Sequence, residues 1–171
     1  MGSEMCIRDR YTPTHRLQRA VAAVEQGGAE RYLVLQEYGA HNEAEALRKP
    51  SKLNNVNVIV FVYDSSDTNS FSYISNLRQQ YPYLASFPTL FVATKSDLDL
   101  ARQRHEVQPD MYCRKLGLNI PHLGAGPLNV SAYLDEVAQL YNILLSIAMD
   151  SRGAVPAHSG SLGPVHFRWR I

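Results

Sequence analysis

The pattern of hydrophobic positions predicts a strand, a helix and a second strand in the middle of the chain. Residues 58–63 are six consecutive apolar residues, mostly β-branched or aromatic, which is typical of a strand buried on both faces. Phe71, Ile74 and Leu77 recur at helical spacing, and residues 89–93 predict another buried strand. A strand, crossover helix and strand form a βαβ unit, whose ligands bind just beyond the carboxyl ends of its strands.

The flanking sequence extends this pattern to an α/β sheet with helices on both faces. Residues 17–24 and 31–35 predict two strands joined by a hairpin turn at Gly27–Gly28. Further elements are expected at residues 42–48 (helix), 109–116 (helix, with Gly117 as its C-cap), 128–130 (short strand) and 134–147 (amphipathic helix).

The two ends of the chain do not follow this pattern. Residues 1–10 show no periodicity and are interpreted as a non-native leader, with a disordered native terminus as the alternative. Residues 11–149 form the predicted domain. Residues 150–171 are rich in Gly, Pro and Ser, and we expect them to be disordered or non-native. A docking motif in this tail is the alternative.

Composition narrows the classes of partner. The net charge of the 171 residues is +1, so the sequence has neither the basic footprint of a nucleic-acid-binding protein nor a polybasic membrane patch. Two cysteines and six scattered histidines form no disulfide framework or metal-ligand spacing. No apolar run approaches the roughly 18 residues that span a bilayer, and we expect no membrane segment.

The residues after the second buried strand, Thr94-Lys95-Ser96-Asp97, lie where a ligand is expected. A carboxylate fixed by a tight turn accepts hydrogen bonds from N1–H and the N2 amino group of guanine. Adenine offers neither donor, so it leaves the carboxylate unpaired at a cost of about 1–3 kcal/mol. The Lys95 stem can cover the base. A polar turn without a ligand is the alternative interpretation.

This tetrapeptide resembles the base-recognition motif of Ras-like GTPases, Asn-Lys-x-Asp, with Thr94 in place of Asn. The resemblance implies that Thr94, Lys95 and Asp97 bind guanine. Ser131-Ala132 is similar to the family's Ser-Ala-Lys, which implies backbone N–H donors to the guanine carbonyl.

Two earlier stretches also resemble this family. Residues 11–14, Tyr-Thr-Pro-Thr, are similar to its first switch loop and imply that Thr14 ligates magnesium, although a capped proline turn is the alternative. Residues 36–39 correspond to Asp-x-x-Gly, which implies that the Gly39 backbone approaches the terminal phosphate.

Three departures limit the activity that the resemblance implies. Gln36 replaces the motif's aspartate, and Ala40 replaces the glutamine that orients water. None of the ten glycines is followed by lysine, so the phosphate-binding sequence Gly-x-x-x-x-Gly-Lys-Ser/Thr is absent. We therefore expect a Ras-like P-loop GTPase fold that lacks its first strand, phosphate loop and first helix. In the family's strand order the missing strand lies between the strands at residues 31–35 and 58–63, so its loss would leave two edges open.

Longer blocks make the resemblance more specific. Residues 35–39, 63–71 and 92–97 are similar to the C-terminal GTPase domain of fungal mitochondrial Rho GTPases, the Miro family. The resemblance implies GTP or GDP with magnesium, a location on the cytosolic face of the mitochondrial outer membrane, and protein adaptors in mitochondrial movement, morphology and inheritance. Two functions remain open: a fragment of a GTP hydrolase, itself with little catalysis, or a GTPase-like adaptor whose catalytic parts have decayed.

Overall fold

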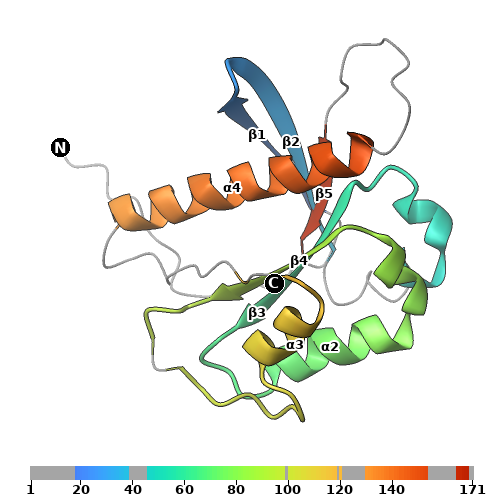
Figure 1. Ribbon diagram of the computed structural model, residues 1–171, viewed down its shortest axis with the longest axis vertical. Coiled ribbons are helices and arrows are strands. Elements are labelled where there is room, and N and C mark those ends of the chain that lie inside the picture. Colours follow the sequence, from blue (N-terminus) through green and yellow to red (C-terminus); the bar gives the residue numbers. More distant parts are fainter. Residues whose placement is uncertain are drawn as a thin grey trace.

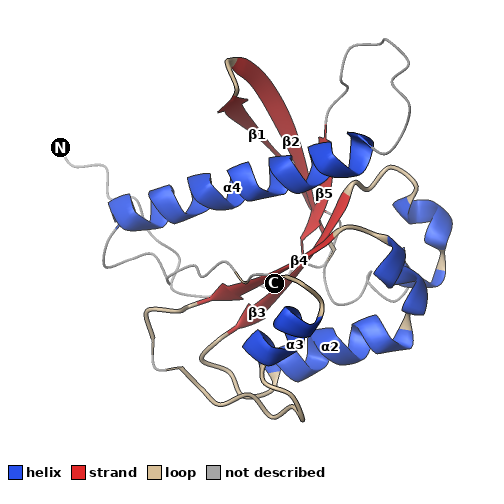
Figure 2. Ribbon diagram, in the orientation of Figure 1, coloured by secondary structure: helices blue, strands red, loops and turns tan. Residues whose placement is uncertain are grey.

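A five-stranded sheet lies at the centre of the computed structural model, which describes residues 18–38, 46–98, 100–118, 120, 130–153 and 165–169. Helices pack around this sheet (Figures 1 and 2). The strands are β1 (Gln18–Gln26), β2 (Ala29–Glu37), β3 (Val58–Asp64), β4 (Thr89–Thr94) and β5 (Val165–Trp169). The helices are α2 (Ser70–Gln80), α3 (Pro109–Lys115) and α4 (Val130–Gly153), with 3₁₀ turns η1 (Pro50–Leu53) and η2 (Pro82–Ser86).

The sheet is mostly parallel, with the strand order β1-β2-β5-β3-β4. Only β1 and β2 are antiparallel, whereas β2 with β5, β5 with β3, and β3 with β4 pair in parallel. This arrangement confirms the mixed α/β class that the hydrophobic pattern predicts.

The β3 strand divides its side chains between two hydrophobic cores. Val58, Val60 and Val62 pack in a cluster with the α4 residues Leu140, Leu144, Leu145 and Ala148. The alternate residues Ile59, Phe61 and Tyr63 pack in a second cluster with residues of α2 and α3, including Phe71, Ile74 and Cys113. Successive strand residues point to opposite faces, so helices cover this part of the sheet on both sides. An unbroken apolar run is the sequence that such a position requires.

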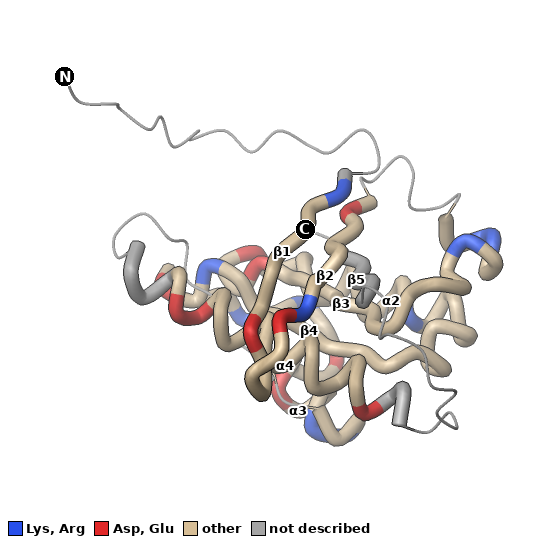
Figure 3. The backbone as a smooth tube through the Cα atoms, turned by 90° about the horizontal axis from the view of Figure 1, so that it is seen from above, with Lys and Arg blue, Asp and Glu red and all other residues tan. Residues whose placement is uncertain are grey.

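The β1–β2 hairpin follows its prediction closely. Its register runs from Gln18 opposite Glu37 to Gln26 opposite Ala29. Gly27 and Gly28 have φ values of 61° and 75°, the left-handed geometry that a two-residue hairpin turn needs and that glycine adopts without steric cost. Acidic and basic residues both occur along this hairpin (Figure 3).

Two expectations about the later part of the chain differ from the structure. Val130 begins α4 instead of ending a strand, because Val130, Leu134 and Val137 also lie at helical spacing. The tail was expected to be disordered or non-native, and its residues Val165–Trp169 form β5 between β2 and β3. Sheet edges need backbone partners, and β5 supplies them where the sequence led us to expect two open edges. Residues 1–17 and 39–45 lie outside the described part of the chain.

We expect Phe91→Ala to lower the free energy of unfolding by about 3–5 kcal/mol. The Phe91 ring is fully buried and stacks on Phe61 at a centroid distance of 5.2 Å, so truncation leaves a cavity in the second core. Val21→Ala on β1, where the side chain is 64% exposed, is the control and should change stability by less than about 0.5 kcal/mol. Urea unfolding measures both, and equal midpoints for the two variants would contradict this packing.

Candidate functional site

The turn that follows β4 begins with an unusual backbone conformation. Lys95 has a φ of 54°, in the left-handed region that non-glycine residues seldom adopt. The Leu98 N–H donates to the Lys95 carbonyl at 3.1 Å and closes the turn. Asp97 lies at the exposed surface of this turn. Backbone strain of this kind costs on the order of 1–3 kcal/mol and is concentrated at functional sites.

Hydrogen bonds join the carboxyl ends of β3 and β4 directly below this turn. The Thr94 hydroxyl donates to the Tyr63 carbonyl at 3.0 Å. In return, the Ser65 hydroxyl and backbone N–H donate to the Thr94 carbonyl at 2.6 and 3.0 Å. These bonds fix Thr94 at the edge of the sheet, the position where α/β proteins bind ligands.

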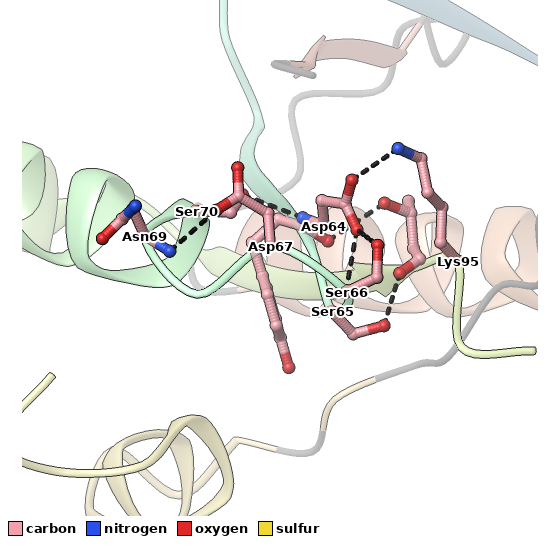
Figure 4. Close-up of polar contacts among 9 residues, drawn as sticks. Asp64, Ser65, Ser66, Asp67, Asn69, Ser70 and Lys95 are labelled. Atoms are coloured by element: carbon pink, nitrogen blue, oxygen red, sulfur yellow. Dashed lines mark hydrogen bonds and ion pairs between the residues drawn. The ribbon is translucent and has the colours of Figure 1, made fainter. Parts of the chain in front are cut away.

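An ion pair crosses this edge (Figure 4). The Lys95 ammonium donates to Asp64 Oδ2 at 2.5 Å. The other carboxylate oxygen, Oδ1, accepts from the Ser66 N–H at 2.9 Å and from the Ser66 hydroxyl at 2.6 Å. Asp64 therefore holds the strained lysine from the neighbouring strand.

Two opposing effects act on the Asp64 pKa. Partial burial favours the neutral acid and raises the pKa, but the hydrogen bonds from Lys95 and Ser66 and the lysine charge outweigh it. The net result is a pKa below the ordinary value of 3.8. Asp64 is thus a carboxylate at neutral pH, as the ion pair requires.

The segment from Ser65 to Ser70 is fixed on its other side by the loop before α3. The Asp64 N–H donates to the Ser70 hydroxyl at 2.9 Å, and the Ala101 N–H donates to the Ser65 carbonyl at 2.9 Å. Gln103 is only 5% exposed, and its side-chain oxygen accepts from the Phe71 N–H at 3.1 Å. This buried glutamine anchors the loop to the first turn of α2.

The structure brings together part of the predicted site. Thr94, Lys95 and Asp97 share one turn at the sheet edge. Ser131 and Ala132 lie in the first turn of α4, not after a strand. Thr14 and Gly39 lie outside the described residues.

The sequence analysis assigned no part in the site to Asp64 or to Gln103. Asp64 had a usable signal, since it is the polar residue that ends a run of six buried apolar residues, Val58 to Tyr63. Gln103 had none, because a glutamine in a polar stretch gives no indication of burial.

Other chemistries have little support in the described part of the chain. No three His, Cys, Asp or Glu residues there gather as metal ligands. Burial, with the nearby Asp110 carboxylate, raises the pKa of the Cys113 thiol to about 12, so this thiol is protonated at neutral pH. Among the described helices, none combines the length and apolar character needed to cross a bilayer.

Comparison with known proteins finds several relatives that share one name. The chain is 68% identical over 145 residues to Mitochondrial Rho GTPase 1 of Mycosarcoma maydis, a match that covers 85% of this chain and 19% of that protein. The protein of the same name from Cryptococcus neoformans is 51% identical over 146 residues, covering 85% of this chain and 20% of the relative. That of Yarrowia lipolytica is 39% identical over 152 residues, covering 88% and 22%. No protein-family model matches the chain.

The mixed α/β sheet, the turn after β4 and these relatives together define a GTPase-related chain, and the small-GTPase homologues suggest a Ras-like fold. More particularly, the chain belongs to the mitochondrial Rho GTPase family and matches a fragment of such a protein. It spans only about a fifth of the length of the relatives quoted above.

We expect Asp64→Asn to weaken the acid dependence of stability. A carboxyl group whose pKa is lowered by folding stabilises the folded state above its unfolded pKa, near 3.8, and loses that contribution as the pH falls through the folded value. Urea unfolding between pH 7 and pH 3 should therefore show a smaller loss of stability for Asp64→Asn than for the wild type.

Lys95→Met removes the ammonium and should reduce the same acid-dependent loss, with little further effect when it is combined with Asp64→Asn. Lys52→Met, at an exposed lysine in η1, is the matched control. An unchanged acid dependence in Asp64→Asn would show that the ion pair does not stabilise the fold.

Proposed function

We propose that this chain is part of the C-terminal GTPase domain of a mitochondrial Rho GTPase and that the Thr94–Asp97 turn binds the guanine base. The observation that supports this proposal most directly is the constrained turn at the carboxyl edge of β4, with Lys95 in the left-handed region and tied to Asp64. A surface turn without a ligand has no need for this combination of strain and hydrogen bonding.

Two residues of the turn and two residues of α4 have proposed roles. The exposed Asp97 carboxylate would accept hydrogen bonds from guanine N1–H and the N2 amino group. The Lys95 stem would cover the base, with its ammonium held by Asp64. The N–H groups of Ser131 and Ala132 would donate to the guanine carbonyl, since the first N–H groups of a helix have no acceptor within the helix.

The phosphates and magnesium would be held by other parts of the domain. We propose that the Gly39 N–H approaches the terminal phosphate and that the Thr14 hydroxyl is a magnesium ligand. Oxygen ligands suit magnesium, which proteins commonly bind through one or two side chains together with phosphate oxygens. The Gly-x-x-x-x-Gly-Lys-Ser/Thr sequence is absent from this chain, so we expect the domain's GTP hydrolysis to be weak or absent in it.

A second candidate is a GTPase-like adaptor without catalysis. Gln36 favours it, because β2 places an amide where the family's motif has a carboxylate. In either case we infer that the whole protein acts at the cytosolic face of the mitochondrial outer membrane. Its partners there would be protein adaptors of mitochondrial movement, morphology and inheritance.

If the turn recognises guanine, GTP should displace a fluorescent GDP analogue from this chain more effectively than ATP. Xanthosine triphosphate should also compete poorly, because it has an oxygen in place of the guanine N2 amino group. Asp97→Ala should abolish the preference by removing the acceptor, whereas Asp67→Ala, a turn aspartate outside the proposed contacts, should retain it. Equal competition by GTP and ATP would overturn the assignment.

Because the phosphate-binding sequence is absent, we expect this chain to have a weak affinity for GTP. Base contacts alone must offset an association cost of several kcal/mol, so calorimetry should give a GTP dissociation constant of about a millimolar or weaker. Adding a native N-terminal segment of roughly 30–40 residues with Gly-x-x-x-x-Gly-Lys-Ser/Thr should restore tight, magnesium-dependent binding. Micromolar binding by the chain as it stands would show that other groups hold the phosphates.

A further inference from the structure

The outer edge of β1 is open to another strand. β1 is the outermost strand of the sheet (Figure 1), and its only strand partner within the described residues is β2. Proteins usually block such an edge with proline, lysine, a bulge or a very short strand. β1 has nine residues, Gln-Arg-Ala-Val-Ala-Ala-Val-Glu-Gln, in an unbroken register with β2, and none of these features protects it.

The hairpin turn determines which backbone groups face this open edge. Gln26 and Ala29 flank a two-residue turn and form the hydrogen-bonded pair that closes it. Hydrogen-bonded and non-bonded pairs alternate along an antiparallel ladder, so the even-numbered residues of β1 bond to β2. The N–H and C=O groups of the odd-numbered residues therefore point outward, and these residues are Arg19, Val21, Ala23 and Glu25.

The side chains of these four residues lie on the face of the hairpin that is turned away from α4. The alternate residues Ala22 and Val24 pack against the α4 core, whereas all four odd-numbered residues are exposed. Within the described part of the chain, the side chains of Arg19 and Glu25 have no hydrogen-bond or ion-pair partner. Glu25 also stands opposite a like charge, Glu30, in the hairpin, which is unfavourable.

The sequence of β1 is complementary to itself when a second copy runs antiparallel beside it. A two-fold axis at Ala22 places Arg19 opposite Glu25 of the second copy, and the reverse at the other end. It also places the larger Val21 opposite the small Ala23.

This register is also the one that the backbone allows. Each of these pairs joins two odd-numbered residues, so the outward-pointing groups of both copies meet. An axis between two residues would place bonding groups opposite non-bonding ones. Among the axes that lie on a residue, the axis at Ala22 pairs all nine residues of the strand.

We propose that β1 is a homodimerisation surface, through which two copies of this chain join their sheets by antiparallel pairing of β1 about Ala22. The contact would contain about eight backbone hydrogen bonds, with an Arg19–Glu25 ion pair at each end. Both copies use the same surface, so the contact closes at two copies and does not grow into a filament.

The dimer would be weak and would leave the candidate guanine site accessible. One strand edge buries less than the roughly 1,200–2,000 Å² of a stable interface, so the dimer should dissociate on dilution. The Thr94–Asp97 turn follows β4, at the opposite edge of the sheet. The proposal therefore does not depend on the guanine assignment.

Sedimentation equilibrium of the full chain should show a reversible monomer–dimer equilibrium over about 10–500 μM. Arg19→Glu places like charges opposite each other at both ends and should weaken dimerisation by about tenfold or more. Glu25→Arg should have an effect of similar size. Arg114→Glu, the same charge change at an exposed position of α3, is the matched control and should have no effect.

The double variant Arg19→Glu with Glu25→Arg restores opposite charges and should dimerise within about threefold of the wild type. Because it carries both substitutions, its recovery would show that neither one acts by unfolding the chain.

Hydrogen exchange followed by NMR gives a second readout that locates the contact. At a concentration where the dimer predominates, the outward amides of Val21 and Ala23 should exchange about tenfold more slowly than in dilute solution. The amides of Ala22 and Val24 bond to β2 in both states and are internal controls that should not change.

A chain that stays monomeric over the whole concentration range would overturn the proposal. So would a dimer that neither single charge reversal weakens, or a double variant that dimerises no better than the single ones. Species larger than a dimer would show open-ended association in place of the closed two-fold contact.

Discussion

The structure depends on the burial of β3 on both faces. Six consecutive residues, Val58 to Tyr63, are each at most 5% exposed, and every backbone group in such a strand must be satisfied by its neighbours. This constraint explains why α4 covers one face while α2 and α3 cover the other. It also explains why the turn after β4 is well positioned, since β4 is held to β3 along its whole length.

The parts of the fold that local sequence determines were predictable. Two glycines specify the β1–β2 turn, and the apolar run of β3 and the helical spacing of α2 lead to nearly the observed bounds. The position of β5 was not predictable in this way. Its strand is determined by distant partners, β2 and β3, that offer open edges, and a short apolar–basic alternation near a chain end does not identify them.

The candidate site likewise combines a feature that local sequence predicts with contacts that only the fold determines. The sequence predicted the Thr94–Asp97 turn because strand ends and a recognisable tetrapeptide lie next to each other in the chain. The Lys95–Asp64 ion pair joins residues 31 positions apart, and it depends on the parallel pairing that places the ends of β3 and β4 together. Gln103 reaches the first turn of α2 through the fold of its loop. Neither contact has a signature in local sequence.

The central claim is that the turn between Thr94 and Asp97 recognises guanine, and an NMR titration with guanosine tests it most directly, because a nucleoside has no phosphates to bind elsewhere. The account predicts concentration-dependent shifts of the Lys95, Ser96 and Asp97 amides with guanosine, and no such shifts with adenosine at equal concentration. Shifts of equal size with both nucleosides, or guanosine shifts confined to other parts of the chain, would contradict it.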